Sequence, residues 1–420
     1  MASPFVRSFS TAYKRARSHD SPTPLASPPA PKATKVKEET GDEESRIPAF
    51  LRQPPAAIRA KFQDLVWREK LRILQGRNDS SSQWAQEVGP HVTKRNRYIN
   101  VQPWEKSRVR LKVAEGKSDY INASPISLRD PLTSENTNYI ATQGPKQSGT
   151  SHFWHMVWQE TKDVAVIIML TQTHDGATEK CFQYFPLTPE AGPFTIEPFG
   201  ITEDSPEGVL TFVETLPDSN SKIEIRRLSL TFGDETRDVW HFFFSGWPDH
   251  SAPEDEDRAA LLELLRLSAE KNSIPSNPRI IHCSAGVGRS GTFIALEHLL
   301  ANVDAGSIAE IKDQTDIIHE VVDRLREQRM LMVQSEEQYR FLYDVVLEEY
   351  QRKEAAVLSG QHSPKLRKLA SGMEATLLCD TDEKEDAGQR RDTDPNQSKA
   401  TENSNDEEGE KVIHETKDAS

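Results

Sequence analysis

Cysteine is scarce in this chain of 420 residues, which contains only Cys181, Cys283 and Cys379. Three cysteines so far apart exclude a disulfide framework and a structural zinc site, because both need cysteines in closely spaced sets. A reducing compartment inside the cell is the simplest setting for such a chain. We therefore expect a cytoplasmic protein that could also enter the nucleus.

Long apolar runs are missing as well. The longest covers residues 164–170, whereas a membrane-spanning helix needs about 20 residues, so we expect no membrane segment. The start of the chain also lacks the apolar core of a secretory signal. Residues 1–19 carry four basic residues and no acidic one. This leaves a mitochondrial presequence as an alternative, although the prolines that follow favour a disordered tail.

Both ends of the chain lack aliphatic clusters. Residues 1–45 are rich in Ser and Pro, residues 356–420 are polar and acidic, and we expect both tails to be disordered. Ser-Pro and Thr-Pro pairs in the first tail make proline-directed kinases potential partners, although linker composition explains these pairs equally well. The net charge of −14, without a basic stripe interleaved with aromatic residues, argues against nucleic acid as a partner.

The remaining segment, residues 46–355, is expected to form one domain. Its all-apolar residues 164–170 indicate a strand buried on both faces. Within residues 223–232 the apolar positions change phase, so we expect a bulge near Arg226 and Arg227. Further patterns predict helices over residues 55–73, 255–269 and 317–325, a strand over residues 239–244, and a last helix capped by Ser335 with Gln338. The expected fold class is α/β (α+β), with one core and a twisted mixed β-sheet flanked by helices on both sides.

The most informative stretch is residues 282–291, which read His-Cys-Ser-Ala-Gly-Val-Gly-Arg-Ser-Gly. Apolar residues before it predict a strand, and those after it predict a helix. The backbone N–H groups of the loop and the N-terminus of the helix would then point at one spot. That spot favours an anion and the thiolate form of a cysteine. A nucleophile within an anion cradle predicts chemistry on a phosphate group.

Individual residues of this loop have distinct expected roles. Cys283 would attack phosphorus and form a thiophosphate. Arg289 offers a planar fork of donors to two phosphate oxygens. Ser290 would donate a hydrogen bond to the sulfur as it leaves, and His282 would order the loop. The residues whose backbone closes around the anion are Ser284, Ala285, Gly286, Val287 and Gly288.

The glycines of the loop also match Gly-x-Gly-x-x-Gly, the fingerprint of dinucleotide-binding proteins. That interpretation needs an acidic residue at the end of a following strand to hold a ribose. Asp304 and Glu310 follow the loop, but no strand pattern precedes them. Nucleotide binding also leaves Cys283 and Arg289 unexplained. A small-residue turn with an incidental cysteine is the remaining alternative.

The order His-Cys-x5-Arg-Ser-Gly resembles the active-site signature of the cysteine-based protein tyrosine phosphatases. Residues 96–98 resemble the phosphotyrosine-recognition loop of the tyrosine-specific branch of this family, and residues 247–249, Trp-Pro-Asp, resemble its acid-bearing loop. Further matching motifs lie at residues 119–124, 139–145, 153–154, 180–181, 328–329 and 332–334. The resemblance extends to the cytosolic members found in fungi. It implies the protein tyrosine phosphatase fold and an enzyme that needs no metal or cofactor.

The resemblance assigns roles to residues far from the loop. Asp249, on a mobile loop with Trp247 and Pro248, would protonate the tyrosine oxygen as it leaves and then act as a base toward water. Gln334 would position that water.

It also implies a substrate pocket with supporting residues. Tyr98 would stack on the substrate ring and make the pocket too deep for the shorter phosphoserine. Asn100 and Gln338 would contact the substrate as well. Lys180 and Glu179 would support the site, Glu179 by bracing the arginine of the loop.

Three positions depart from the family's common pattern. Asn100 stands where many relatives have an acidic residue that holds the substrate backbone, which leaves the peptide preference open. Ser251 replaces a glycine after Trp-Pro-Asp-x, and the loss of a hinge glycine could slow loop closure. Leu331 replaces a small residue that often opens a second phosphotyrosine pocket near Arg326, so we expect that pocket to be narrow.

The expected function is hydrolysis of phosphotyrosine in signalling proteins through a phosphocysteine intermediate. MAP kinases are a substrate class by analogy with the fungal members alone. A dual-specificity phosphatase shares the cysteine and the arginine, but it lacks the tyrosine-recognition loop. The second alternative is an inactive scaffold that binds phosphotyrosine. The residues that argue against such a scaffold are Cys283, Arg289, Asp249 and Gln334.

Overall fold

The structure, a computed structural model, describes residues 46–199, 206–216, 222–247, 251–311 and 315–359. The predicted tails fall almost entirely outside these residues, so their disorder stays a prediction. The predicted domain end at residue 355 lies inside the last helix, α8 (Glu336–Leu358), which continues for three further residues.

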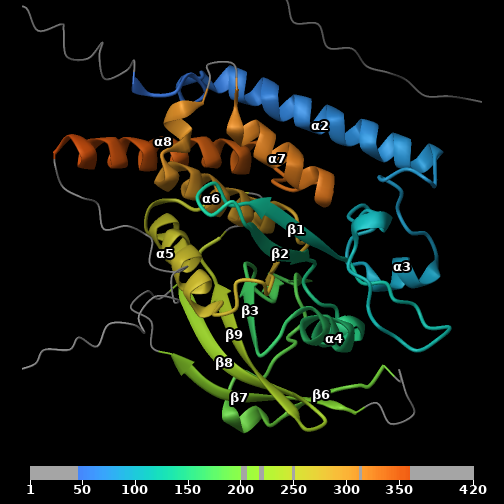
Figure 1. The fold of residues 1–420 in the computed structure, drawn as a ribbon. Helices are drawn as coiled ribbons and strands as arrows, with labels where there is room; N and C mark the ends of the chain where they lie inside the picture. The colour runs from blue at the N-terminus through green and yellow to red at the C-terminus, as the bar shows by residue number, and fades with distance from the viewer. Residues whose placement is uncertain (1–45, 200–205, 217–221, 248–250, 312–314, 360–420) are drawn as a thin grey trace, which may run out of the picture. The chain divides into compact units, whose positions relative to one another are not determined.

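Eight strands form one mixed sheet, which confirms the predicted fold class (Figure 1). Their order across the sheet is β1 (Ala123–Arg129), β2 (Asn136–Thr142), β10 (Arg279–His282), β3 (Val164–Met169), β9 (Glu235–Phe244), β8 (Ile223–Phe232), β7 (Gly208–Leu216) and β6 (Phe194–Ile196). β10 is parallel to both of its neighbours, and β3 is parallel to β9, whereas the other pairs are antiparallel. The carboxyl end of β10 therefore opens at the edge where such sheets hold ligand sites.

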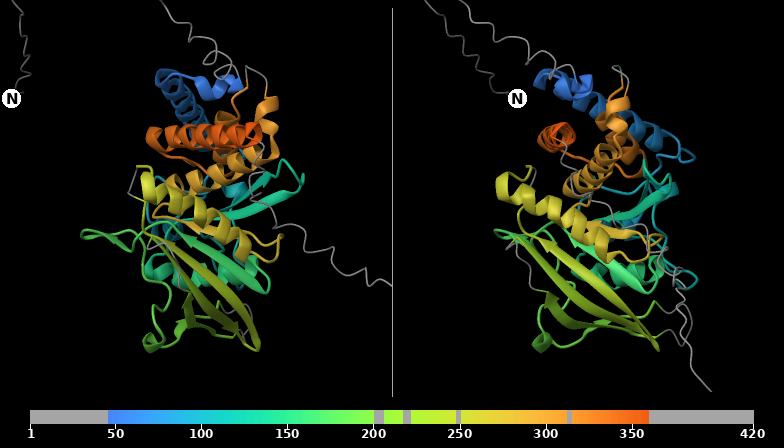
Figure 2. Two further views of the ribbon diagram at one scale, coloured as in Figure 1. Left: turned by 90° about the vertical axis from the view of Figure 1, so that its left-hand side faces the viewer. Right: turned by 60° about the vertical axis from the view of Figure 1, so that its left-hand side comes forward.

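Helices cover both faces of this sheet, as predicted (Figures 1 and 2). One face carries α2 (Pro55–Asn78), α5 (Asp255–Lys271), α6 (Gly288–Ala305), α7 (Ile317–Gln328) and α8, and the other carries α4 (Thr150–Glu160). The shorter elements are α3 (Pro90–Arg95), the hairpin of β4 (His174–Asp175) and β5 (Thr178–Glu179), and the 3-10 turns Ala49–Arg52, Glu105–Ser107, Gln147–Gly149, Pro189–Ala191 and Ser307–Glu310. The helices predicted over residues 55–73, 255–269 and 317–325 lie within α2, α5 and α7.

The buried apolar side chains form two clusters, one on each face of the sheet, rather than the single core expected. Strand β3 contributes to both because its side chains alternate. Val166 and Ile168 belong to the cluster on the side of the sheet that carries α5 to α8, whereas Ala165 and Ile167 belong to the cluster on the side of α4. All of β3 is buried, as its apolar run predicts. The sheet itself separates the two clusters.

The bulge predicted near Arg226 and Arg227 is found on the neighbouring strand instead. β8 pairs with β9 without interruption, while the register between β7 and β8 shifts at Val213. Ile225 belongs to the cluster on one face and Leu228 to the cluster on the other. Simple alternation produces this pattern when the two halves of a strand are buried on opposite faces.

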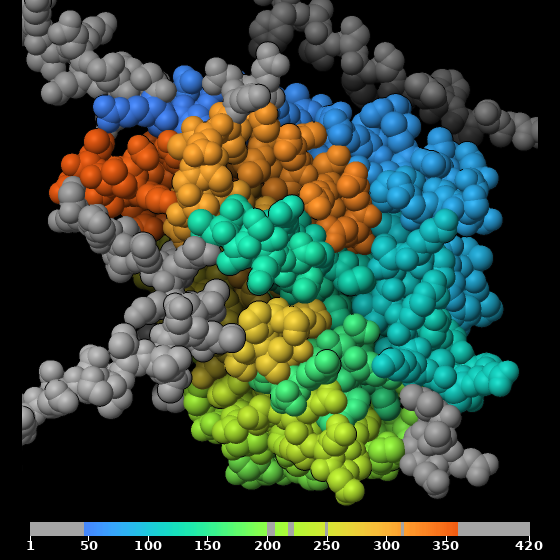
Figure 3. Space-filling model, viewed as in Figure 1, coloured from blue at the N-terminus to red at the C-terminus, as the bar shows by residue number. Residues whose placement is uncertain are grey.

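The first and last long helices lie side by side, with α2 packed against α7 and α8 (Figures 1 and 3). Ion pairs reinforce this contact, since both Arg68 and Arg72 of α2 bind Asp323 of α7. α8 begins with the predicted capping box of Ser335 and Gln338. None of the described helices is long and apolar enough to cross a membrane.

Candidate active site

The loop that joins β10 to α6, residues 283–287, is called the cysteine loop below. Gly286 has a φ of 70°, and a Cβ at this position would lie 2.0 Å from the carbonyl oxygen of Thr142. Only glycine fits such an approach. The chain therefore doubles back beneath Cys283, and the Gly286 N–H donates to the sulfur at 3.2 Å. The N–H groups of the first turn of α6 follow directly behind this loop.

Cys283 is buried and its pKa is lowered. The residue is 3 % exposed, and burial by itself would raise the pKa of its thiol. The charge of Arg289, the hydroxyl and N–H of Ser290 and the N–H of Gly286 more than offset this effect, so the pKa lies below its usual value. Cys181 is also buried, but there burial dominates and raises the pKa. Cys283 is thus the better nucleophile of the two.

Arg289 connects the cysteine loop to the segment that carries the predicted acid. Its Nη1 donates to the carbonyl oxygen of Trp247 at 3.2 Å. The indole N–H of Trp247 donates in turn to the carbonyl oxygen of Ser251 at 2.9 Å. These contacts fix the residues two positions before and two positions after the predicted acid. Pro248 and Asp249 lie outside the described residues, so their placement stays a prediction.

Tyr98 reaches the cysteine loop from the recognition loop. Its phenol oxygen lies 2.8 Å from Oγ of Ser284. The Ser284 hydroxyl donates its only proton to the carbonyl oxygen of Lys180 at 2.9 Å, so Tyr98 must be the donor to Ser284. This bond fixes the ring of Tyr98 beside the anion cradle.

A pocket of about 250 Å³ opens onto Cys283. Its lining residues are Tyr98, Asn100, Val101, Lys180, Cys283, Ser284, Ala285, Gly288, Arg289, Gln334 and Gln338. Most of the predicted substrate-binding residues are therefore brought together. Gly286 and Val287 do not line the pocket, since Gly286 packs on Thr142 and Val287 is fully buried. Val101 was missed, because an apolar residue gives no chemical signal in a sequence.

Gln334 and Gln338 enter the pocket from the start of α8. The N–H of Gln334 donates to Oε1 of Gln338 at 3.1 Å, and the N–H of Gln338 donates to Oγ of Ser335 at 3.1 Å. A Cβ on Gly288 would lie 3.0 Å from Oε1 of Gln338, so the small residue leaves room for this side chain. The capping box that begins the helix thereby sets the position of both glutamines.

A family model described as protein-tyrosine phosphatase matches residues 92–348 of the chain. The chain belongs to the protein-tyrosine phosphatase family. The resemblance seen in the sequence is confirmed, and so is the prediction of an enzyme of this class. Every predicted site residue, from Tyr98 to Gln338, lies within the matched range.

Two yeast proteins show the same relationship. The chain is 36% identical over 298 residues to tyrosine-protein phosphatase 2 of Schizosaccharomyces pombe, and the match covers 69% of this chain and 39% of that longer protein. It is 35% identical over 329 residues to tyrosine-protein phosphatase 1 of Saccharomyces cerevisiae, with 70% of this chain and 95% of that protein covered. The predicted similarity to fungal members is confirmed.

The fold is that of the protein-tyrosine phosphatases. It is similar to a solved structure described as PTPN18 in complex with HER2-pY1196 phosphor-peptides, with a TM-score of 0.59 and 28% sequence identity. The match covers 70% of this chain and 93% of that one. The predicted fold is thereby confirmed on both sequence and structure.

His282 of this phosphatase-family site is fully buried and contacts the cysteine loop, while its role in ordering the loop stays a prediction. Its Nδ1 lies 3.2 Å from the carbonyl oxygen of Cys283, which can only accept, so Nδ1 carries the proton. Nε2 then accepts from the hydroxyl of Tyr184 at 2.6 Å, and that oxygen accepts from His241. Burial lowers the pKa of His282 to about 4. Because His282 is neutral near pH 7 and fully hydrogen-bonded, it does not act as a base.

Arg329 braces the cysteine loop from behind, a role that the sequence did not assign. Its Nε donates to the carbonyl oxygen of Gly286 at 2.8 Å, and its Nη2 to that of Ala285 at 3.1 Å. Nη2 also donates to Asn122 at 2.8 Å, and Asn122 donates to Asn96 at 3.0 Å. The network joins the cysteine loop to the recognition loop. The only sign of this role in the sequence was the match of residues 328–329 to a motif of the family.

Glu179 holds Arg97 instead of Arg289, so the predicted partner is corrected. Its Oε1 lies 3.1 Å from both Nη1 and Nη2 of Arg97, which also donates to the carbonyl oxygens of Gly144 and Pro145. The reason is local geometry. Glu179 ends the short hairpin of β4 and β5 and remains 40% exposed, on the side of the recognition loop. It supports the site through that loop.

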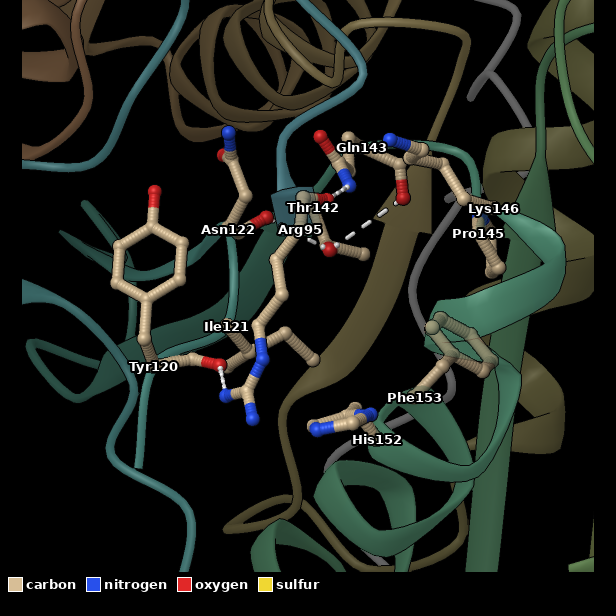
Figure 4. A pocket seen from close by; sticks show the side chains of 11 residues that line it. Arg95, Tyr120, Ile121, Asn122, Thr142, Gln143, Pro145, Lys146, His152 and Phe153 are labelled. Atoms are coloured by element: carbon tan, nitrogen blue, oxygen red, sulfur yellow. Dashed lines mark hydrogen bonds between the residues drawn. The ribbon is translucent and has the colours of Figure 1, made fainter. Parts of the chain in front are cut away.

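A second, smaller hollow lies beside the recognition loop (Figure 4). Its volume of about 20 Å³ is enough for a water molecule but not for a phosphate. Arg95 and His152 point toward one another in its wall, and burial together with the charge of Arg95 lowers the pKa of His152 to about 4. Gln143 donates to the carbonyl oxygen of Arg95 and accepts from the N–H of Arg97. This wall therefore supports the recognition loop rather than binding substrate.

The structure describes the surroundings of two departures from the family pattern, Leu331 and Ser251. Arg326 is 1% exposed and donates to the carbonyl oxygens of Met332 and Val333 at 3.0 and 2.9 Å. A side chain held in this way is not available to a second phosphate, whereas the narrow pocket expected beside Leu331 stays a prediction. Ser251 is not among the described residues with a positive φ, so its backbone does not require the glycine of the family pattern.

Proposed function

We propose that this protein hydrolyses phosphotyrosine in other proteins through a phosphocysteine intermediate. The observation that carries the proposal is Cys283, a thiol of lowered pKa that shares one pocket with Arg289 and Tyr98. An aryl phosphate fits this arrangement, because its ring can stack on Tyr98 while its phosphate meets the loop N–H groups and Arg289. Membership of the family supports the reaction class.

In the first step, the thiolate of Cys283 attacks phosphorus. A sulfur–phosphorus bond forms, the bond from phosphorus to the tyrosine oxygen breaks, and that oxygen takes a proton from Asp249. Arg289 and the N–H groups of the loop hold the non-bridging oxygens, on which charge develops.

In the second step, water replaces the sulfur. Gln334 orients the water, the carboxylate of Asp249 takes its proton, an oxygen–phosphorus bond forms, and the sulfur leaves as thiolate. The Ser290 hydroxyl is buried and interacts with the sulfur of Cys283, whose pKa it helps to lower. Its proton is therefore available to the departing sulfur of Cys283.

Replacing Asp249 by alanine is expected to lower kcat about 10³-fold, because the leaving tyrosine oxygen then receives no proton. The cradle is unchanged, so phosphotyrosine proteins should remain bound. Steady-state kinetics and capture of phosphoproteins measure the two effects. Glu254→Ala is the matched control, since this nearby acid lies outside the pocket. An Asp249→Ala variant within threefold of the wild-type rate would exclude Asp249 as the acid.

Replacing Tyr98 by alanine is expected to lower kcat/KM for a phosphotyrosine peptide about tenfold or more, because the substrate ring loses its stacking partner. Tyr98→Phe is the control, since it keeps the ring and loses only the bond to Ser284. A phosphoserine peptide should not be hydrolysed by the wild-type protein. Equal turnover of both peptides would indicate a dual-specificity enzyme, and binding without turnover would indicate a scaffold.

The substrates that we propose are phosphotyrosine signalling proteins, with MAP kinases as one class by analogy with fungal relatives. Proline-directed kinases are proposed to modify the N-terminal tail. A solved relative is described in complex with phosphopeptides of HER2, which supports phosphoproteins as substrates here. A cytoplasmic location is supported by Cys181 and Cys283, which are both free thiols and suit a reducing compartment.

A further inference from the structure

Glu69 is a buried acidic residue on α2, outside the residues that the family model matches. It is 2% exposed, and its Oε1 accepts a hydrogen bond from the N–H of Leu331 at 3.2 Å. Leu331 belongs to the turn of residues 330–334, which precedes α8 and ends in Gln334. We call this segment the Gln334 turn. A carboxylate from the first long helix thus holds the chain that delivers a predicted catalytic side chain.

The Gln334 turn has an unfavourable backbone conformation. Leu331 has a φ of 60° and Val333 a φ of 58°. This left-handed region is uncommon for residues other than glycine and is most strained for a β-branched residue such as valine. Strained conformations persist only where the surrounding structure holds them, and they concentrate at functional sites.

Hydrogen bonds hold the turn from three directions. Arg326 of α7 donates to the carbonyl oxygens of Met332 and Val333. The N–H of Val333 donates to the carbonyl oxygen of Val287 at 3.1 Å, which ties the turn to the cysteine loop. The N–H of Leu331 faces α2, and the carboxylate described above is its acceptor. Without it, a partly buried donor would lose its partner.

The charge of Glu69 acts on the same turn through Arg326. Burial lowers the pKa of Arg326, and the charge of Glu69 opposes this effect. Burial likewise raises the pKa of Glu69 to about 7, against the charges of Arg326 and Arg72. The groups that face Glu69 are Arg326 and Asp323 from α7, Arg72 from its own helix and the N–H of Leu331. Loss of the carboxylate would leave the buried Arg326 less compensated.

We propose that Glu69 is a positioning residue for hydrolysis of the phosphocysteine intermediate, because through Leu331 and Arg326 it holds Gln334 where the attacking water must be oriented. The inference rests on the proposed function. Glu69 does not line the substrate pocket, so it acts only through the turn. The first step depends on Cys283 and Arg289. Hydrogen bonds outside the Gln334 turn hold these two side chains, from Gly286 to the sulfur and from Arg289 to Trp247. Substitution of Glu69 should therefore slow the second step more than the first.

The test compares the two steps in Glu69→Asp, whose carboxylate is one methylene shorter, and in Glu69→Gln, which removes the charge. With p-nitrophenyl phosphate, kcat should fall about tenfold, while kcat/KM, which reports the first irreversible step, should change less than about threefold. Phosphoenzyme should then accumulate, and stopped-flow absorbance should show a burst of nitrophenol that equals the enzyme concentration. Loss of stability alone produces no such burst.

Asp323→Asn is the matched control. Asp323 lies in the same ion cluster and binds Arg72 at 2.6 Å, but it makes no hydrogen bond to the turn. This variant should unfold at a lower temperature and show no burst. Leu331→Gly should rescue Glu69→Asp, because glycine adopts the left-handed conformation without strain.

Two outcomes would overturn the inference while the proposed function stands. They are a proportional fall of kcat and kcat/KM in the folded Glu69→Asp variant, and a burst equally large in Asp323→Asn. If Glu69→Gln fails to fold, the more conservative variant Glu69→Asp still tests the inference. Failure of the proposed function would look different, since the wild-type protein itself would then form no covalent phosphoenzyme when quenched with a ³²P-labelled substrate.

Discussion

Serine in place of Cys283 is expected to lower turnover about 10⁶-fold, the scale seen when a catalytic nucleophile is removed. Arg289 and the loop N–H groups can stabilise a thiolate, but a serine hydroxyl ionises far less readily. The cradle itself should keep its shape, since Gly286 is also held by its close approach to Thr142 and Arg289 by its hydrogen bond to the carbonyl oxygen of Trp247. Phosphotyrosine peptide should therefore still bind. Steady-state kinetics and fluorescence anisotropy measure the two properties separately.

Cys181→Ser is the matched control for this prediction. Cys181 is the other described free thiol and is equally buried, and its sulfur contacts the carbonyl oxygen of Phe182, which a serine hydroxyl can also reach. Its pKa is raised by burial, so it is not expected to ionise. This variant should stay within about threefold of the wild-type rate. Loss of turnover in Cys181→Ser, or its survival in Cys283→Ser, would contradict the assignment of the nucleophile.

The cysteine loop could be predicted because its chemistry lies within ten consecutive residues. The nucleophile, the arginine and the glycine that permits a φ of 70° at Gly286 are fixed by local order in the chain. The same holds for the capping box of Ser335 and Gln338, in which the side chain of each residue accepts a hydrogen bond from the backbone N–H of the other. Local rules of this kind do not depend on the rest of the fold.

The partners of isolated charged residues could not be predicted. Glu179 binds Arg97, which is 82 residues away along the chain, because the orientation of a two-residue hairpin decides where its carboxylate points. Arg329 and Glu69 act on loops that other elements bring to them. Apart from the motif match at residues 328–329, their positions carry no pattern that distinguishes them from ordinary surface charges. Only the packing of α2 against α7 brings Glu69 to the Gln334 turn.

The errors about a single core and about a bulge in β8 have a similar origin. Alternation in β8 was interpreted as a slip because one buried face was assumed for the whole strand. In the structure, Ile225 and Leu228 are buried on opposite faces of the sheet, so both halves follow the same alternation. A sequence shows which residues alternate, but it does not show which face each half of a strand buries.

Methionine in place of Arg289 is expected to lower kcat/KM about 10⁴-fold. The guanidinium can donate two charge-assisted hydrogen bonds to the phosphate, and loss of one such donor costs about 10²–10³-fold. Its charge is also the largest effect that lowers the pKa of Cys283, so the variant should have a higher thiol pKa. Since only the thiolate reacts, the acid limb of the profile of kcat/KM against pH should move to higher pH. Alkylation of Cys283 by iodoacetamide across pH measures this pKa directly.

Arg289→Lys separates the two contributions of the arginine. Lysine keeps a positive charge near the sulfur but loses the planar fork, so the pKa of Cys283 should rise less than in Arg289→Met, while kcat/KM should still fall strongly. Arg279→Lys is the control, because Arg279 is a buried arginine of β10 that binds Glu297 outside the pocket. If Arg289→Met left the alkylation profile unchanged, the loop N–H groups alone would set the pKa of the nucleophile. The arginine would then serve only to bind phosphate.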